Sequence, residues 1–296
     1  MRYEAHRPGP PLGDYVDRLW IVTGAPGHAR ERVLPTGTVD LIFGIDDAEG
    51  WIYDASGTPL FGGRGPGAAV SGCYGSAFEY ETRARGHVVG IHFKPGGAGR
   101  LLGAPPGAFA NAHVHLVDLW GPSATELVER LWASRSSRDQ FDLLEQALIA
   151  RMSDRFHRRP AVTAALAELE QPHIEVGSVA RMLGLSHRRF IEIFCEDVGM
   201  TPKRYSMVRR LHRALALAAP SPTPAWSRIA AECGYYDQAH LCRDWVELTG
   251  LSPQEFVGQR GLAAKDNHVA VPDAGVKSVQ YASEIRSSRR TVRSQR

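Results

Sequence analysis

From Arg2 to about Asn111, the chain carries short apolar or alternating runs separated by glycines and prolines. Val39–Ile45, Phe78–Thr82 and Val88–Phe93 are such runs. Short strands separated by turn residues are typical of a β-barrel or a β-sandwich. We therefore predict a small β-rich domain, a β-barrel of the cupin-like kind, over residues 1–121.

After this domain the pattern changes to the spacing of helices. The sequence Ser123-Ala-Thr-Glu126 is typical of a capping box, in which the serine oxygen and the glutamate carboxylate satisfy free N–H groups at a helix start. Two amphipathic runs follow and predict a helical pair over residues 122–156, which serves as a linker or a dimer element. The apolar faces of the two runs are Leu127, Val128, Leu131 and Trp132, and Phe141, Leu144, Leu148 and Met152.

Residues 157–260 show helical spacing throughout and predict an all-α domain of about seven helices. Pro160 suits the first turn of a helix, and a longer helix is expected to run from Pro202 to about Ala218. The residues predicted to start helices are Ser178, Ser186, Thr201, Ser227 and Asp237.

Beyond Gly261 the chain is rich in serine and arginine and lacks apolar periodicity. This composition predicts a disordered basic tail over residues 261–296. The pattern as a whole is that of an α+β protein with a β-rich domain, a helical linker and an all-α domain.

One motif occurs twice within the helical domain, over Val179–Pro202 and over Ile229–Pro253. Each copy has an alanine, a glycine four residues later, an N-cap candidate, an aromatic-anchored helix and a Gly-x-Thr/Ser-Pro exit. The copies are 50 residues apart at their alanines, before the turn, and 51 residues apart at the glycines that end their second helices. A helical pattern on both sides of a glycine turn, found twice, predicts two helix-turn-helix units and a protein that reads DNA.

In a helix-turn-helix unit the second helix buries one face and leaves the other free to enter the major groove. The spacing predicts that Phe190, Ile193 and Phe194 are buried in the first unit, and Leu241 and Trp245 in the second. The candidate DNA-binding residues on the outer faces and near the backbone are Ser186, Arg188, Arg189, Ile191, Glu192 and Cys195, and Asp237, Gln238, Ala239, Cys242 and Arg243.

These side chains have the chemistry for base recognition. Arginine binds guanine O6 and N7, glutamine binds adenine, glutamate accepts from cytosine N4, and isoleucine or alanine contacts a thymine methyl group. Each good bidentate pair contributes about 1 to 3 kcal/mol of discrimination. The alternative interpretation is that these are solvated faces of a helical bundle. It stays open, but two units in tandem favour it less than a single unit would.

The connecting helix sets the distance between the two units. From Pro202 to Ala218 it spans roughly 24 Å at about 1.5 Å per residue, and successive major-groove faces lie about 34 Å apart. With the width of the units added to the length of this helix, both second helices could reach adjacent grooves. If the total distance is shorter than the groove spacing, the DNA must bend toward the protein. Lys203, Arg204 and Arg209 on this helix suit phosphate contacts.

Composition adds few constraints. A formal net charge of +3 over 296 residues permits nucleic-acid binding without requiring it. The N-terminal sequence has no apolar signal core, and no run approaches the roughly 20 apolar residues of a membrane span, so we expect a cytoplasmic protein. The four cysteines form no Cys-x-x-Cys pair, and we expect reduced thiols rather than a zinc finger.

The segment from about Glu175 to Val257 resembles the AraC/XylS class of bacterial transcription regulators. The resemblance implies a sequence-specific regulator and not an enzyme, with double-stranded DNA as its partner. RNA polymerase and a small-molecule effector are further candidate partners, and the chain is expected to act as a monomer or homodimer. The signature residues are Ala230, Gly234-Tyr235, Asp237, Leu241, Arg243, Trp245, Gly250, Ser252 and Pro253.

Two further motifs are similar to a subgroup of this class with a poorly characterised sensory domain. They are Leu34-Pro35-x-Gly37-x-x-Asp40-Leu-Ile-Phe43 and Phe93-Lys-Pro95-Gly-Gly97-Ala98. The chain departs from the class in Glu196 and Glu247, which stand where members usually carry basic residues around the aromatic anchor. We expect fewer phosphate partners there.

A metal-dependent or small-molecule enzyme with a cupin-like domain is the alternative function. His113-Val-His115 has the spacing of a cupin metal site, and His87 and His92 are close in sequence, but the expected carboxylate is missing. We therefore predict neither a metal nor a cofactor. A fused repair methyltransferase is excluded because this part of the chain has a single cysteine, Cys73.

Other features of the N-terminal part also have structural interpretations. Its glycine runs lack the endings of phosphate-binding loops and are interpreted as turns. Four aromatic residues could line an effector pocket, but each is interpreted as part of the core instead. They are Trp20, Phe43, Trp51 and Phe93.

Overall fold

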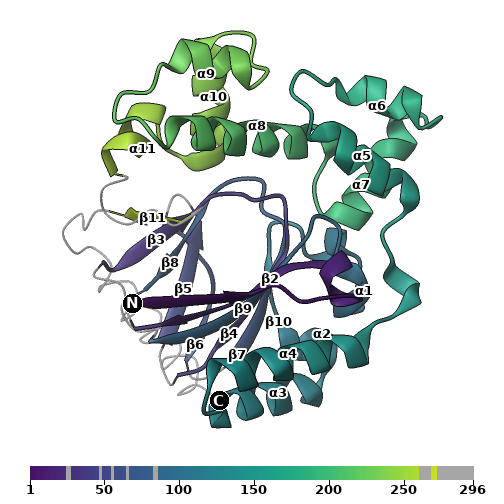
Figure 1. Ribbon diagram of the computed structural model, residues 1–296, viewed down its shortest axis with the longest axis vertical. Coiled ribbons are helices and arrows are strands. Elements are labelled where there is room, and N and C mark those ends of the chain that lie inside the picture. Colours follow the sequence, from purple (N-terminus) through teal and green to yellow (C-terminus); the bar gives the residue numbers. More distant parts are fainter. Residues whose placement is uncertain are drawn as a thin grey trace, which may run out of the picture.

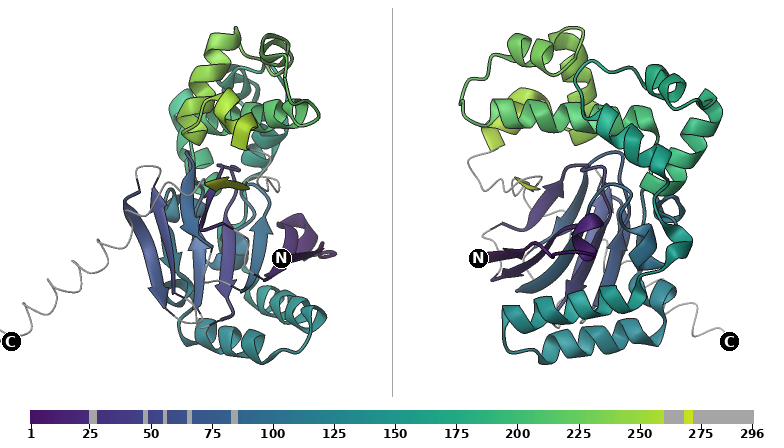
Figure 2. Two further views of the ribbon diagram at one scale, coloured as in Figure 1. Left: turned by 90° about the vertical axis from the view of Figure 1, so that its left-hand side faces the viewer. Right: turned by 45° about the vertical axis from the view of Figure 1, so that its right-hand side comes forward.

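The protein consists of a β-rich N-terminal domain, a helical pair on one side of it and an all-α domain on the other (Figure 1). These parts come from a computed structural model that describes residues 1–24, 28–46, 49–54, 57–64, 67–82, 86–259 and 268–271. The two views of Figure 2 show that the sheets lie between the helical pair and the all-α domain.

The described strands form two sheets, in which every adjacent pair is antiparallel. The first has the order β1 (Arg2–His6), β2 (Val16–Thr23), β9 (His87–Phe93), β4 (Asp40–Gly44), β7 (Gly67–Ser71) and β10 (His113–His115). The second has the order β11 (His268–Val271), β3 (Arg30–Val33), β8 (Phe78–Glu81), β5 (Glu49–Asp54) and β6 (Pro59–Arg64). The predicted β-rich domain is confirmed, but the sheets do not close into one barrel because the described residues of their edge strands do not pair with each other.

Of the four aromatic residues predicted to belong to the core, Phe43 and Phe93 do, whereas Trp20 and Trp51 are half-buried. Phe43 and Phe93 are fully buried. Trp20 lies against Gly90, where a Cβ would be 2.2 Å from the ring. Trp51 lies against Gly62, where a Cβ would be 2.3 Å from the ring. These glycines therefore make room for the indole rings.

Short helices connect the sheets to a helical pair. They are α1 (Gly99–Leu102), η2 (Pro106–Phe109) and α2 (Leu116–Trp120), followed by α3 (Pro122–Ala133), α4 (Ser137–Arg151) and η3 (Asp154–Phe156). A further short helix, η1 (Leu12–Asp14), lies between β1 and β2. Within residues 122–156, where a helical pair is predicted, the structure has α3, α4 and η3, which lie next to the first sheet (Figure 1).

Two details of α3 differ from the prediction. The helix begins at Pro122, so Ser123 already lies in its first turn and donates its hydroxyl to the Trp120 carbonyl (2.7 Å) instead of forming a capping box. Trp132 is 49% exposed because it lies at the edge of the buried stripe formed by Ala124, Leu127 and Leu131.

The all-α domain has seven helices among the described residues, as predicted. They are α5 (Pro160–Leu169), α6 (Val176–Met182), α7 (His187–Val198), α8 (Pro202–Ala218), α9 (Trp226–Glu232), α10 (Gln238–Thr249) and α11 (Pro253–Gln259). Ser186, Thr201 and Asp237 cap their helices through side-chain oxygens, as predicted. Ser178 and Ser227 instead lie inside the first turns of α6 and α9, since Glu175 and Ala225 hold the N-cap positions.

Part of the predicted disordered tail is a strand. Residues 268–271 form β11, which pairs with β3 and buries Val269 to 2% exposure. The edge of β3 offers free N–H and C=O groups, and the alternating sequence of β11 can bury one side against the domain. The other residues of 261–296 lie outside the described residues.

A continuous apolar core joins the N-terminal domain to the helical domain. Leu34 and Phe93 from the sheets belong to the same buried cluster as Phe194 and Tyr205 from the helices. Among the described residues, no helix is both long and apolar enough to cross a membrane.

Candidate nucleic-acid interface

The first helix-turn-helix unit consists of α6, a turn at Gly184 and α7. Gly184 has a φ of +67°, a left-handed conformation that glycine adopts without strain. Phe190 and Phe194 are fully buried and meet edge to face at 5.7 Å between ring centroids. The buried face predicted from the sequence is thus the face that packs on the domain.

The outer face of α7 carries a small network of charges. Arg188, Arg189 and Glu192 are exposed, whereas Ile191 and Cys195 are half-buried. Glu192 accepts a hydrogen bond from Arg188 Nε (3.0 Å) and pairs with Arg189 (3.5 Å), and the bond from Arg188 lowers the pKa of Glu192. Because such exposed pairs are weak and screened by salt, DNA can replace them.

The second unit consists of α9, a turn at Gly234 and α10. Leu241 and Trp245 are fully buried, and the Trp245 ring lies between those of Trp226 (5.2 Å) and Phe256 (5.4 Å). The unit is therefore anchored by aromatic packing from α9 and α11.

The outer face of α10 is more open than that of α7. Gln238, Ala239 and Arg243 are exposed, and Cys242 is half-buried. Within the described residues, the side chains of Gln238 and Arg243 have no hydrogen-bonding or ionic partner. They are available for the groups on the edges of base pairs.

The turn before α10 contains a residue that sequence analysis missed. Tyr236 is 93% exposed and directly precedes the N-cap residue Asp237. An exposed tyrosine hydroxyl at the start of a reading helix suits a phosphate oxygen. The position of an aromatic residue next to an N-cap could have indicated it.

The basic residues of α8 differ in their surroundings. Lys203 is exposed. Arg204 pairs with Glu247 and donates from Nε to the Gly75 carbonyl (2.6 Å), and Arg209 pairs with Glu170 (2.7 Å). Acidic residues at the C-cap of α5 and on α10 thus hold two of the three predicted phosphate-binding side chains in ion pairs, and both arginines are half-buried.

The C-terminal ends of both reading helices contact the N-terminal domain. Near the end of α7, Gly107 of η2 lies so close to the Cys195 carbonyl that a Cβ there would be 2.7 Å from the oxygen. Near the end of α10, the Ala77 N–H donates to the Leu248 carbonyl (2.8 Å) and Arg32 donates to that of Thr249 (3.3 Å).

The connecting helix contacts the same domain. The Tyr205 ring packs on Gly37, where a Cβ would lie 3.0 Å from the ring, and His212 Nε2 lies 2.7 Å from the Pro35 carbonyl. Burial lowers the pKa of His212, which favours the neutral ring that donates this hydrogen bond. The Leu34–Phe43 motif of the sequence therefore forms part of the interface with the helical domain.

The histidines considered for a metal site lie apart. His92 pairs with Asp40 (2.7 Å), His113 Nδ1 is 2.6 Å from the Tyr74 hydroxyl, and His87 Nε2 is 3.2 Å from the Gln140 side chain. His115 packs on the Phe61 ring (4.4 Å). In the described ranges of the chain, no three His, Cys, Asp or Glu side chains are grouped as metal ligands would be.

Comparison with known proteins agrees with the two-part organisation. A helix-turn-helix domain model matches residues 179–259, and a domain of unknown function, DUF6597, matches residues 4–115. An uncharacterized HTH-type transcriptional regulator of Haemophilus influenzae is 33% identical over 121 residues, which are 40% of this chain and 38% of that protein. The arabinose operon regulatory protein of Escherichia coli is 28% identical over 139 residues, 44% of this chain and 47% of that protein.

The matched C-terminal helices are thus similar to those of transcription regulators such as the arabinose operon regulatory protein. The AraC/XylS signature residues noted in the sequence lie on α9, in the glycine turn, at the N-cap of α10, on α10, between α10 and α11, and at the start of α11. The chain spans less than half the length of the curated relatives it matches. Among solved structures, ToxT from Vibrio cholerae is similar with a TM-score of 0.43 at 8% identity, over 87% of this chain and 98% of that chain.

Proposed function

We propose that the chain is a sequence-specific transcription regulator that inserts α7 and α10 into adjacent major grooves. The observation that carries the proposal is the outer face of α10, where Gln238 and Arg243 are exposed and have no partner among the described residues, while Leu241 and Trp245 anchor the opposite face. In the equivalent unit, Arg188 and Arg189 lie on the outer face of α7. Double-stranded DNA is the partner that both faces fit.

The length of α8 bears on how the DNA is held. From its first to its last Cα, this helix of 17 residues spans about 24 Å, which is less than the spacing of about 34 Å between successive major-groove faces. The width of the two units supplies part of the difference, and bending of the DNA toward the protein supplies the remainder at a cost of order 1 to 6 kcal/mol.

Control by the N-terminal domain is part of the proposal. That domain contacts the ends of both reading helices and the helix between them, so a ligand that changes its packing changes the placement of the reading heads. The chain then acts as an effector-controlled regulator in the cytoplasm rather than as an enzyme, as a monomer or homodimer, with RNA polymerase as a candidate further partner.

The test is binding of the full chain to duplex DNA. A fluorescently labelled fragment from upstream of its own coding sequence is titrated at several salt concentrations, and footprinting locates the site. Release of counterions predicts a steep, linear fall of log K with log salt, together with two protected patches about one helical turn apart. Absence of duplex binding at low salt would rule out the proposal.

A further inference from the structure

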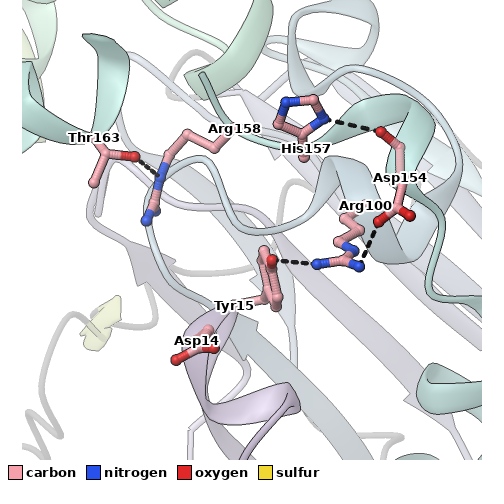
Figure 3. Close-up of a pocket in the computed structure, with 7 residues that line it drawn as sticks. All are labelled: Asp14, Tyr15, Arg100, Asp154, His157, Arg158 and Thr163. Carbon is pink, nitrogen blue, oxygen red and sulfur yellow. Dashed lines mark hydrogen bonds and ion pairs between the residues drawn. The ribbon is translucent and has the colours of Figure 1, made fainter. Parts of the chain in front are cut away.

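A cleft of about 480 Å³ lies where the N-terminal domain, the linker and the first helix of the all-α domain meet (Figure 3). This volume is within the range of small-ligand sites. Both domains contribute to its wall. The lining residues are Asp14, Tyr15, Arg100, Asp154, His157, Arg158 and Thr163.

The turn behind the cleft is built from the Phe93–Ala98 motif, to which no part of DNA reading assigns a role. Lys94 Nζ donates to the Gly13 carbonyl (2.5 Å), and the Lys94 N–H donates to that of Tyr15 (2.8 Å). Gly97 lies so close to the Tyr15 carbonyl that a Cβ would be 2.2 Å from the oxygen. The motif therefore fixes Tyr15, and with it one wall of the cleft.

The same motif holds an arginine that lies just before α5. Arg158 donates from Nη1 to the Pro95 carbonyl (2.6 Å) and from Nε to the Thr163 hydroxyl (2.9 Å). Its stem packs on Gly96, where a Cβ would lie 2.7 Å from Arg158 Cδ. These contacts use neutral acceptors and leave N–H groups on the guanidinium free.

Two opposite charges on the cleft are uncompensated. Arg100 is paired with Asp154 (2.6 Å) and hydrogen-bonded to the Tyr15 hydroxyl (2.5 Å). Arg158 has no carboxylate partner and Asp14 has no cationic partner among the described residues. In the view of Figure 3 the Arg158 guanidinium lies to the upper left of the Tyr15 ring and the Asp14 side chain to its lower left.

From this arrangement we infer that the cleft binds a small zwitterion, an α-amino acid or a related amino carboxylate. Its carboxylate accepts hydrogen bonds from Arg158, its ammonium group pairs with Asp14, and its side chain lies along the Tyr15 ring. A ligand with one charge would leave the other residue unpaired. The inference names the effector class and in that respect rests on the proposed function.

Binding would connect the two domains. Asp14 and Tyr15 belong to the N-terminal domain, whereas Arg158 and Thr163 belong to the entry into α5, which leads to the first reading unit. A ligand between them stabilises the arrangement in which the domains are packed together.

The experiment uses the purified full chain without DNA, so that its outcome does not depend on the proposed function. Melting temperature and isothermal calorimetry are measured with the common amino acids, and each hit is compared with its deaminated acid and its decarboxylated amine. At least one amino acid is expected to bind, and both analogues are expected to bind about tenfold more weakly or worse.

Two substitutions assign the charges. Asp14→Asn is expected to weaken binding of the amino acid about tenfold and to leave binding of the deaminated acid unchanged. Arg158→Gln is expected to weaken binding of the amino acid about tenfold and to leave binding of the decarboxylated amine unchanged. Asp118→Asn and Arg138→Gln, at exposed positions outside the cleft, are matched controls. The Asp14 side chain has no hydrogen-bonding or ionic partner in the part of the chain that the structure describes, so its variant decides the matter if Arg158→Gln unfolds. Lack of binding by every amino acid at millimolar concentration, or wild-type binding by Asp14→Asn, would overturn the inference.

Discussion

Glu196 and Glu247 occupy equivalent positions near the ends of the two reading helices, 51 residues apart, and each pairs with an arginine at the start of the helix that leads into its unit. Arg159, the N-cap residue of α5, pairs with Glu196 (2.7 Å), and Arg204, in the first turn of α8, pairs with Glu247. The two acidic departures from the AraC/XylS pattern are thus parts of one repeated contact. They fix the reading helices within the domain.

Neutralising Glu247 is expected to strengthen DNA binding. Glu247→Gln removes a negative charge from the end of a reading helix and releases Arg204 from its ion pair. We expect tighter binding to duplex DNA and a salt dependence steeper by up to about one counterion. Anisotropy titrations over a range of salt concentrations measure both. Glu129→Gln, at an exposed position on α3, is the control, and an identical slope for the two variants would show that Arg204 does not reach phosphate.

Arg243 is expected to read a base directly. Arg243→Ala should weaken specific binding and relax the preference at one base pair by about 1 to 3 kcal/mol, because arginine binds guanine in a bidentate manner. Competition with a set of operators, each changed at one base pair, locates that position. Arg138→Ala on α4 is the control, because it changes the net charge by the same amount at a position far from the reading helices in sequence. A uniform loss over all operators would assign Arg243 to phosphate contact instead.

The contact between Gly37 and Tyr205 is expected to hold the two domains together. Gly37 has a φ of +77°, and an added Cβ would lie 3.0 Å from the Tyr205 ring. Gly57 has a φ of +86° with nothing within 4 Å of such a Cβ. Alanine in a left-handed backbone conformation costs about 1 to 2 kcal/mol at either position. The difference in the free energy of unfolding between the two variants therefore measures the contribution of the contact with Tyr205.

Urea unfolding measures that difference. Gly37→Ala is expected to be less stable than Gly57→Ala and to increase proteolysis between the domains, because the Tyr205 ring must move. Equal stability of the two variants would show that the interface accommodates the added methyl group at no cost.

The local features of the sequence predicted more of this molecule than the long-range ones. The caps at Ser186 and Asp237 and the glycine turns were predictable because each depends on residues a few positions away. The pairing of Arg209 was not, since its partner Glu170 lies 39 positions earlier, at the C-cap of α5, and both residues look like surface charges in the sequence. Strand β11 was missed for the same reason: its pairing partner is β3, more than 230 residues away.

Acid is expected to release β11 from the sheet. Burial favours the neutral acid of Glu31 on β3, but hydrogen bonds from His268 of β11, from Tyr80 and from His28 favour the carboxylate more. The pKa of Glu31 is therefore lowered from 4.5 to about 2. Because the folded pKa lies below the unfolded one, the carboxylate contributes stability above pH 4.5, and this contribution is lost as the pH falls toward 2.

The loss at low pH is on the order of 2 to 3 kcal/mol in the free energy of unfolding. Urea unfolding at pH 7, 5, 4 and 3 measures it, and hydrogen exchange of residues 268–271 shows whether β11 is released first. In Glu31→Gln the corresponding pH dependence between 5 and 3 should be flatter than in the wild type, whereas Glu129→Gln should retain it. If Glu31→Gln and the wild type lose stability in parallel, other carboxylates control the acid response and Glu31 does not hold the tail.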